Sequence, residues 1–95
     1  AFRIAGKIFA MIDLENTEWF VLKCNPERAI ELRENYMDIA PAWHMNKKYW
    51  NQLNLYGALP DKLIRTLICH SYNEVVKKIP KRVIAEKGIV QIEEN

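Results

Sequence analysis

The sequence feature that most constrains the fold is a long amphipathic pattern between two prolines, Pro60 and Pro80. Apolar residues recur as neighbouring pairs about every four positions, which is the spacing of one face of an α-helix. Proline is tolerated in the first turn of a helix and cannot continue one, so the two prolines mark the ends. The wide apolar stripe must be buried against a second layer. It consists of Leu63, Ile64, Leu67, Ile68, Tyr72, Val75, Val76 and Ile79.

The N-terminal quarter of the chain predicts that second layer. Residues 2–4, 7–12 and 19–23 are rich in β-branched and aromatic residues, and turn-forming stretches separate them. Residues 51–56 alternate in period two and predict a further strand, which Gly57 ends. Short antiparallel strands of this kind form a sheet with one face to bury.

A first helix is predicted to begin at Asn25-Pro26, an N-cap followed by proline at the first helical position. Pro41 favours an edge strand or a loop after this helix. If the helix extends far enough, four carboxylates share one of its faces. They are Glu27, Glu31, Glu34 and Asp38.

The predicted element order is therefore β-β-β-α-β-α, which is typical of an α+β fold with a mostly antiparallel sheet and two helices on one face. We expect residues 1–82 to form a single domain. Residues 83–95 are expected to form a C-terminal tail or a short strand at 88–92.

The net charge of +2 hides an uneven distribution. Residues 44–82 carry eight Lys or Arg against two Asp or Glu, while the segments on either side each carry a net −2. This pattern favours an anionic partner. No apolar run is long enough to span a bilayer, so no membrane association is expected. Two isolated cysteines, Cys24 and Cys69, form no disulfide framework and favour a reducing, cytoplasmic location.

Catalytic and metal-binding patterns are weak. Cys69 and His70 are neighbours on the predicted helix, so their side chains point about 100° apart and cannot pair directly. The two histidines and two cysteines match no zinc spacing, and the three glycines form no phosphate loop. We therefore expect no enzymatic activity, no metal site and no cofactor.

The segment AWHMNKKYWNQL, residues 42–53, admits two interpretations. Its rings could stack on bases while its lysines contact phosphates. Alternatively, Trp43 and Trp50 complete a small core and brace the sheet against the long helix. Asn46 would then cap a short turn from which Lys47 and Lys48 point to water.

Three segments resemble the MmcQ/YjbR family of small bacterial proteins: GKIFAMI, LKCNPERAIELRENY and residues 44–80. The most specific motifs are HMNKKYWN and GALPDKLI, and the resemblance covers about residues 2–82. It implies a CyaY-like α+β fold with double-wing-like features, in which the family's N-terminal helix is missing from this chain. The matching positions are His44, Asn46, Lys47, Trp50, Asn51, Asp61 and Tyr72.

Family members are often labelled DNA-binding, an inference from similarity of fold. Together with the charge pattern, this leads to the hypothesis of a weak DNA-binding domain that contacts phosphates through a basic and aromatic surface. The candidate nucleic-acid-binding residues are His44, Asn46, Lys47, Lys48, Trp50, Lys77, Lys78, Lys81 and Arg82.

Two alternatives remain open from the sequence. The chain could be a protein-protein interaction module that uses the acidic helix face or a sheet edge. It could also bind a small molecule in a pocket formed by His44, Trp50 and Asn51, which requires these three side chains to converge.

Overall fold

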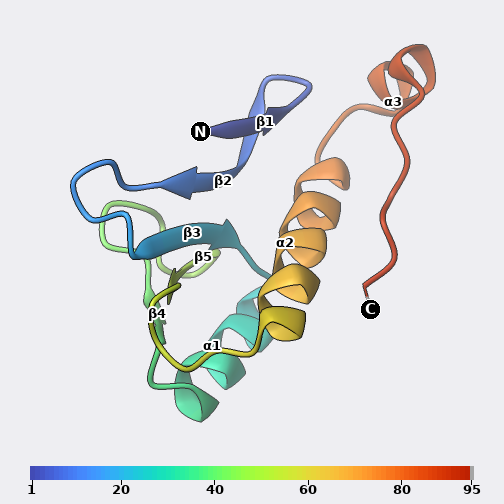
Figure 1. The fold of residues 1–95 in the computed structure, drawn as a ribbon. Helices are drawn as coiled ribbons and strands as arrows, with labels where there is room; N and C mark the ends of the chain where they lie inside the picture. The colour runs from blue at the N-terminus through green and yellow to red at the C-terminus, as the bar shows by residue number, and fades with distance from the viewer. Residues whose placement is uncertain (95) are drawn as a thin grey trace.

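The computed structural model describes residues 1–94, in which one antiparallel sheet of five strands carries two long helices on one face (Figure 1). The strands are β1 (Phe2–Ile4), β2 (Lys7–Ile12), β3 (Trp19–Lys23), β4 (Ile39–Pro41) and β5 (Trp50–Asn54), in the spatial order β1-β2-β3-β5-β4. The helices are α1 (Pro26–Asn35), α2 (Asp61–Val76) and α3 (Lys81–Lys87). The predicted α+β class is confirmed. Pro41 ends an edge strand, one of the two alternatives expected there.

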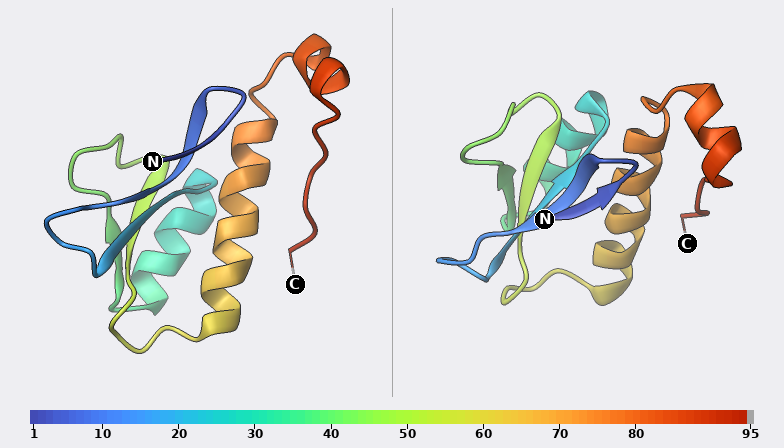
Figure 2. Two further views of the ribbon diagram at one scale, coloured as in Figure 1. Left: turned by 45° about the horizontal axis from the view of Figure 1, so that its top comes forward. Right: turned by 90° about the horizontal axis from the view of Figure 1, so that it is seen from above.

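The core lies between the sheet and helices α1 and α2, which stand on the same side of it (Figure 2). Phe20 of β3 pairs with Leu53 of β5, which in turn pairs with Ile39 of β4, so these three side chains share the covered face. They pack against residues of both helices, including Ala29 and Leu67. Among residues 1–94, no helix covers the opposite face, which we call the open face.

Helix α1 begins where the sequence predicts and ends earlier than the acidic pattern requires. The Asn25 side chain accepts hydrogen bonds from the backbone N–H groups of Glu27 and Arg28, at 3.0 and 3.3 Å. The helix ends at Asn35, so Asp38 lies beyond it and the predicted acidic face retains only its three glutamates. The Asp38 carboxylate instead accepts a hydrogen bond from the Ala58 backbone N–H at 2.8 Å.

Helix α2 places a fully buried serine between two strands. Ser71 Oγ accepts a hydrogen bond from the Lys23 backbone N–H at 2.8 Å and donates one to the Phe9 carbonyl at 2.5 Å. β2 and β3 pair only over Ala10–Ile12 and Phe20–Leu22, so they separate at this point. The hydroxyl thus bonds two backbone groups that lie too far apart, on the separated strands, to bond each other. The β1–β2 hairpin therefore turns away from β3 beside the end of α2.

The C-terminal region contains a helix that the sequence analysis did not predict. Helix α3 follows Pro80, has no buried residue, and ends at Gly88 in the left-handed conformation with φ of 63°. Residues 89–94 belong to no helix or strand and run back along α2 (Figures 1 and 2). Over residues 1–94, no helix is both long and apolar enough to cross a membrane.

Candidate anion-binding groove

The motif of residues 42–53 is divided between a surface turn and strand β5. Asn46 organises the turn, because its side chain accepts from the Lys48 backbone N–H at 3.0 Å and its carbonyl accepts from the backbone N–H groups of Tyr49 and Trp50, both at 3.1 Å. Arg33 of α1 anchors the same turn by donating to the Lys47 carbonyl. The turn is thus held by contacts made to its backbone and leaves both lysine side chains exposed.

The prediction that the two tryptophans complete the core is wrong. Trp43 is 73% exposed and makes an edge contact with the His44 ring, with centroids 5.9 Å apart. Trp50 is half-buried, but it pairs with Lys23 across β3 and β5 and lies on the open face. The covered positions of β5 belong to Asn51 and Leu53, because side chains alternate along a strand.

The predicted small-molecule pocket of His44, Trp50 and Asn51 does not form. Asn51 is 2% exposed on the covered face, where its Oδ1 accepts a hydrogen bond from Arg33 Nε at 2.6 Å. Trp50 points to the opposite face, and His44 lines a different hollow. The three side chains diverge, which rules out this alternative.

A groove of about 820 Å³ opens where the β1–β2 hairpin separates from β3. Its walls come from the hairpin, the end of β3, the start of β5 and the last turns of α2. It brings together Trp50, Lys77 and Lys78 from the predicted site. It also contains cations that the sequence analysis did not select, namely Arg3, Lys7 and Lys23.

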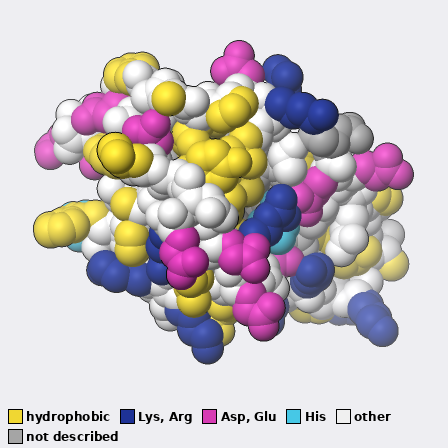
Figure 3. Space-filling model, turned by 90° about the horizontal axis from the view of Figure 1, so that it is seen from below, with side chains coloured by type: hydrophobic (Ala, Val, Ile, Leu, Met, Phe, Trp, Pro, Cys, Tyr) yellow, Lys and Arg dark blue, Asp and Glu magenta, His cyan; other side chains and the backbone are white. Residues whose placement is uncertain are grey.

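The electrostatic balance of the groove is strongly positive. Five cationic side chains line it against one carboxylate, Glu74, which leaves a formal excess of four positive charges. Glu74 pairs with Lys77 at 2.6 Å, while within residues 1–94 Lys7, Lys23 and Lys78 form no ion pair. Seen from below, the molecule shows acidic and basic side chains interspersed around a central apolar area, with no continuous basic face there (Figure 3).

Two aromatic rings border the cations in the groove. The Trp50 ring lies below Lys23 Nζ, which is 6.0 Å from the ring centroid, and Tyr49 lies next to it in sequence. A flat ring beside ammonium groups can stack on a base or sugar while the cations contact phosphates. This arrangement fits an anionic ligand with planar groups.

The other predicted site residues lie outside the groove. Lys47 Nζ is 3.4 Å from the Trp43 carbonyl, and Lys48 Nζ is 5.5 Å from the centroid of the Tyr49 ring. Lys81 and Arg82 lie on α3, where Arg82 pairs with Glu86 at 3.6 Å. His44 and Asn46 also lie outside it.

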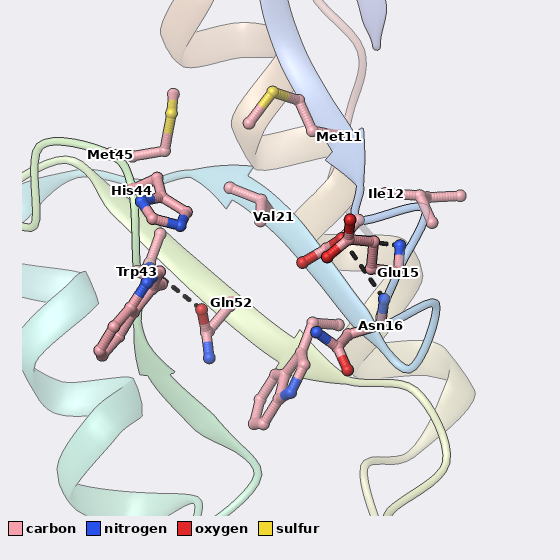
Figure 4. Close-up of a pocket in the computed structure, with 12 residues that line it drawn as sticks. Met11, Ile12, Glu15, Asn16, Val21, Trp43, His44, Met45 and Gln52 are labelled. Carbon is pink, nitrogen blue, oxygen red and sulfur yellow. Dashed lines mark hydrogen bonds between the residues drawn. The ribbon is translucent and has the colours of Figure 1, made fainter.

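His44 lines a second hollow, of about 610 Å³, on the open face of the sheet (Figure 4). Trp43, His44 and Met45 border it on one side and Met11 and Ile12 on the other, above Val21 and Gln52. Its acidic rim includes Asp13, whose pKa is lowered chiefly by a hydrogen bond from the Glu15 backbone N–H. This hollow lacks the cations of the groove and does not suit an anion.

The cysteines show no sign of an activated nucleophile. Burial raises the pKa of Cys24 to about 11, so at neutral pH it is a buried thiol. Cys69 is also unpaired. Within the part of the chain that the structure describes, no three His, Cys, Asp or Glu side chains are grouped so that they could hold a metal ion.

Together, the fold and the groove define a small α+β domain with a cationic, partly aromatic cleft. The YjbR family model matches residues 1–74, and the chain belongs to the YjbR family. The protein named "Uncharacterized protein YjbR" of Escherichia coli K12 is 36% identical over 91 residues, which cover 95% of this chain and 75% of that protein. "Uncharacterized protein YbdF" of Escherichia coli O157:H7 is 35% identical over 82 residues, covering 85% and 67%.

Solved structures are also similar to this one. The Deinococcus radiodurans protein DR2400, with a DUF419 domain, superposes with a TM-score of 0.83 at 36% identity, covering 92% of this chain and 65% of that one. A Pseudomonas syringae protein has a TM-score of 0.56 at 39% identity, covering 59% and 47%. This chain therefore spans just under two thirds of the DR2400 chain.

Proposed function

We propose that this domain binds nucleic acid weakly through phosphates held in the groove between the β1–β2 hairpin and α2. The observation that carries the proposal is the convergence of five cations and two aromatic rings from β1, β2, β3, the end of α2 and the start of β5. Phosphate contacts by Lys and Arg supply most of the affinity of sequence-independent binding. Binding of this class has dissociation constants of roughly 10⁻⁴–10⁻⁶ M at physiological salt.

The shape of the groove favours a single strand over a duplex. Its cations surround a concave surface that also holds Tyr49 and Trp50, and a single strand can place a base on a ring. A duplex presents its bases stacked and would contact only the rim. The domain would act in the reducing cytoplasm that its two unpaired cysteines favour.

A salt titration with a fluorescent single-stranded oligonucleotide and its duplex tests this proposal. Replacing two groove cations, in Lys23→Ala/Lys78→Ala, should weaken single-strand binding and reduce the slope of log affinity against log salt by about 1.4, or 0.7 for each lost phosphate contact. The matched control is Lys47→Ala/Lys62→Ala, which removes the same charge at two exposed residues outside the groove and should leave the slope unchanged.

Two results would reject the proposal. One is the absence of saturable binding at low salt. The other is an equal loss of affinity in the two double variants, which would assign the binding to net charge and not to the groove.

As a second candidate, we propose a protein interaction through the exposed face of α1. Ile30 is 53% exposed among three exposed glutamates, Glu27, Glu31 and Glu34. An apolar side chain rimmed by charges of one sign can dock on a basic partner. Crosslinking in cell extract should then map to residues 27–34, and crosslinks confined to the groove would exclude it.

A further inference from the structure

The C-terminal segment is held against α1 and α2 by side chains that recognise it in two different ways. At Ile92, the Asn73 side chain bonds both backbone groups, accepting from the N–H at 2.7 Å and donating to the carbonyl. One amide side chain thus pairs with a single residue as a neighbouring β-strand would. This contact recognises the backbone of Ile92 and does not depend on the Ile92 side chain.

Two residues further on, Arg28 and His70 recognise the Glu94 carboxylate by its charge and by the positions of its two oxygens. Arg28 Nη1 lies 2.7 Å from one carboxylate oxygen, and His70 Nδ1 lies 3.0 Å from the other. His70 Nε2 accepts a hydrogen bond from the Asn25 backbone N–H at 3.1 Å, so the neutral ring carries its proton on Nδ1 and donates it to Glu94. Partial burial opposes ionisation of Glu94, but the hydrogen bonds from Arg28 and His70 prevail and lower its pKa.

The segment resembles a bound ligand more than a part of the core. Helix α3 buries no residue, Val90 is 70% exposed and Ile92 is 45% exposed. The groups that hold the segment belong to α1 and α2, which are fixed by the core independently of it. His70, for example, is oriented by a hydrogen bond from the Asn25 backbone N–H that does not involve the segment.

We propose that Arg28, His70 and Asn73 form a recognition site for an extended acidic peptide, one with a carboxylate two residues after the position that Asn73 holds. Residues 92–94 of this chain are its resident occupant. A partner peptide must displace them, and a tethered segment competes at an effective concentration on the order of millimolar. Binding in trans should therefore become measurable when the chain's own segment is weakened.

The experiment uses the full chain with Ile92→Pro and Glu94→Gln, which remove the N–H bonded to Asn73 and the charge bonded to Arg28. A fluorescent, C-terminally amidated peptide of sequence IVQIEE is titrated into this variant and into the unaltered chain. Saturable binding is expected for the variant, with affinity at least about tenfold above that of the unaltered chain, because the resident segment no longer competes.

Matched peptides test the recognition itself. Changing the glutamate that corresponds to Glu94 into glutamine should weaken binding by up to about fivefold, because a partly exposed charge-assisted pair is lost. The same change at the position of Glu93 alters net charge equally and should have little effect. Adding Asn73→Ala to the variant should also weaken binding, with circular dichroism confirming that the chain remains folded.

The proposal is overturned if the folded variant shows no saturable binding. It is equally overturned if the two glutamine peptides bind alike, because attraction would then depend on net charge alone. Neither outcome bears on the nucleic-acid groove, since no residue varied here lines it.

Discussion

Two pairs of adjacent lysines, Lys47–Lys48 and Lys77–Lys78, look equivalent in the sequence and occupy very different electrostatic surroundings. Both pairs are exposed. The first lies on a turn where its neighbours are the Trp43 backbone carbonyl and the Tyr49 ring. The second faces three more cations, which arrive from β1, β2 and β3 because the hairpin separates from β3. The comparison shows that the divergence of two strands, and not the local density of lysine, concentrates positive charge on this domain.

The largest effect is expected from removing the hydroxyl that holds the strands apart. Ser71→Ala leaves the Lys23 N–H and the Phe9 carbonyl without their buried partner, at a cost of about 1–3 kcal/mol in the free energy of unfolding. Urea denaturation measures this loss, and oligonucleotide affinity should fall as well because the groove changes shape.

The control for Ser71→Ala is Asn46→Ala, in the turn that carries the other lysine pair. Its hydrogen bond to the Lys48 N–H is exposed, so water can replace it and the loss should be below about 1 kcal/mol. Equal losses in the two variants would contradict the structural role assigned to Ser71.

A smaller effect, of opposite sign, is expected from removing the one carboxylate in the groove. Glu74→Gln frees Lys77 from its ion pair and should raise oligonucleotide affinity at low salt by about 1.5–5-fold, the equivalent of a surface pair of 0.2–1 kcal/mol. Glu31→Gln makes the same change of charge on α1, outside both hollows, and should leave the affinity nearly unchanged. A gain of the same size in both variants would show that net charge, not the groove, governs binding.

The contribution of Glu94, in the C-terminal segment, to the stability of the chain should depend on pH. Because the pKa of Glu94 is lowered in the folded chain, its contribution to stability is present above the unfolded value of about 4.3 and is lost as pH falls through the folded pKa. Glu94→Gln should therefore destabilise the chain by less than about 1 kcal/mol at pH 7 and by nothing at low pH. Thermal unfolding at both pH values measures this, and a difference that persists at low pH would contradict the assignment.

Local patterns predicted much of the fold. The apolar stripe between Pro60 and Pro80 anticipated α2, and the Asn25-Pro26 cap anticipated the start of α1. Helix α3 was overlooked because its seven residues bury nothing, although Pro80 before it and Gly88 after it are recognisable helix boundaries. The acidic spacing does not predict the end of α1, because it continues through Asp38 after the helix has ended.

The groove could be predicted only in part. Lys77 and Lys78 were selected because they are adjacent, and Trp50 because it belongs to a recognisable motif. Lys7 and Lys23 occur singly in apolar strands, and their proximity depends on where β2 stops pairing with β3. At that point Ser71, which is 48 positions from Lys23 in sequence, bonds the backbone of both strands. No local pattern encodes a contact of this range.

The smallest effect on stability is expected at Trp43. Comparing Trp43 with Trp50 contrasts the aromatic residue near Lys47 and Lys48 with the one in the groove. Trp43 is 73% exposed, so Trp43→Ala should change the free energy of unfolding by no more than about 0.5 kcal/mol. Trp50 is half-buried beside Lys23, so Trp50→Ala should lower the free energy of unfolding by more.

Tryptophan fluorescence extends the contrast to function: a stacked base should quench Trp50 and not Trp43. Quenching by an oligonucleotide should therefore persist in Trp43→Ala and diminish in Trp50→Ala. The reverse result would move the binding surface to the turn that carries Lys47 and Lys48.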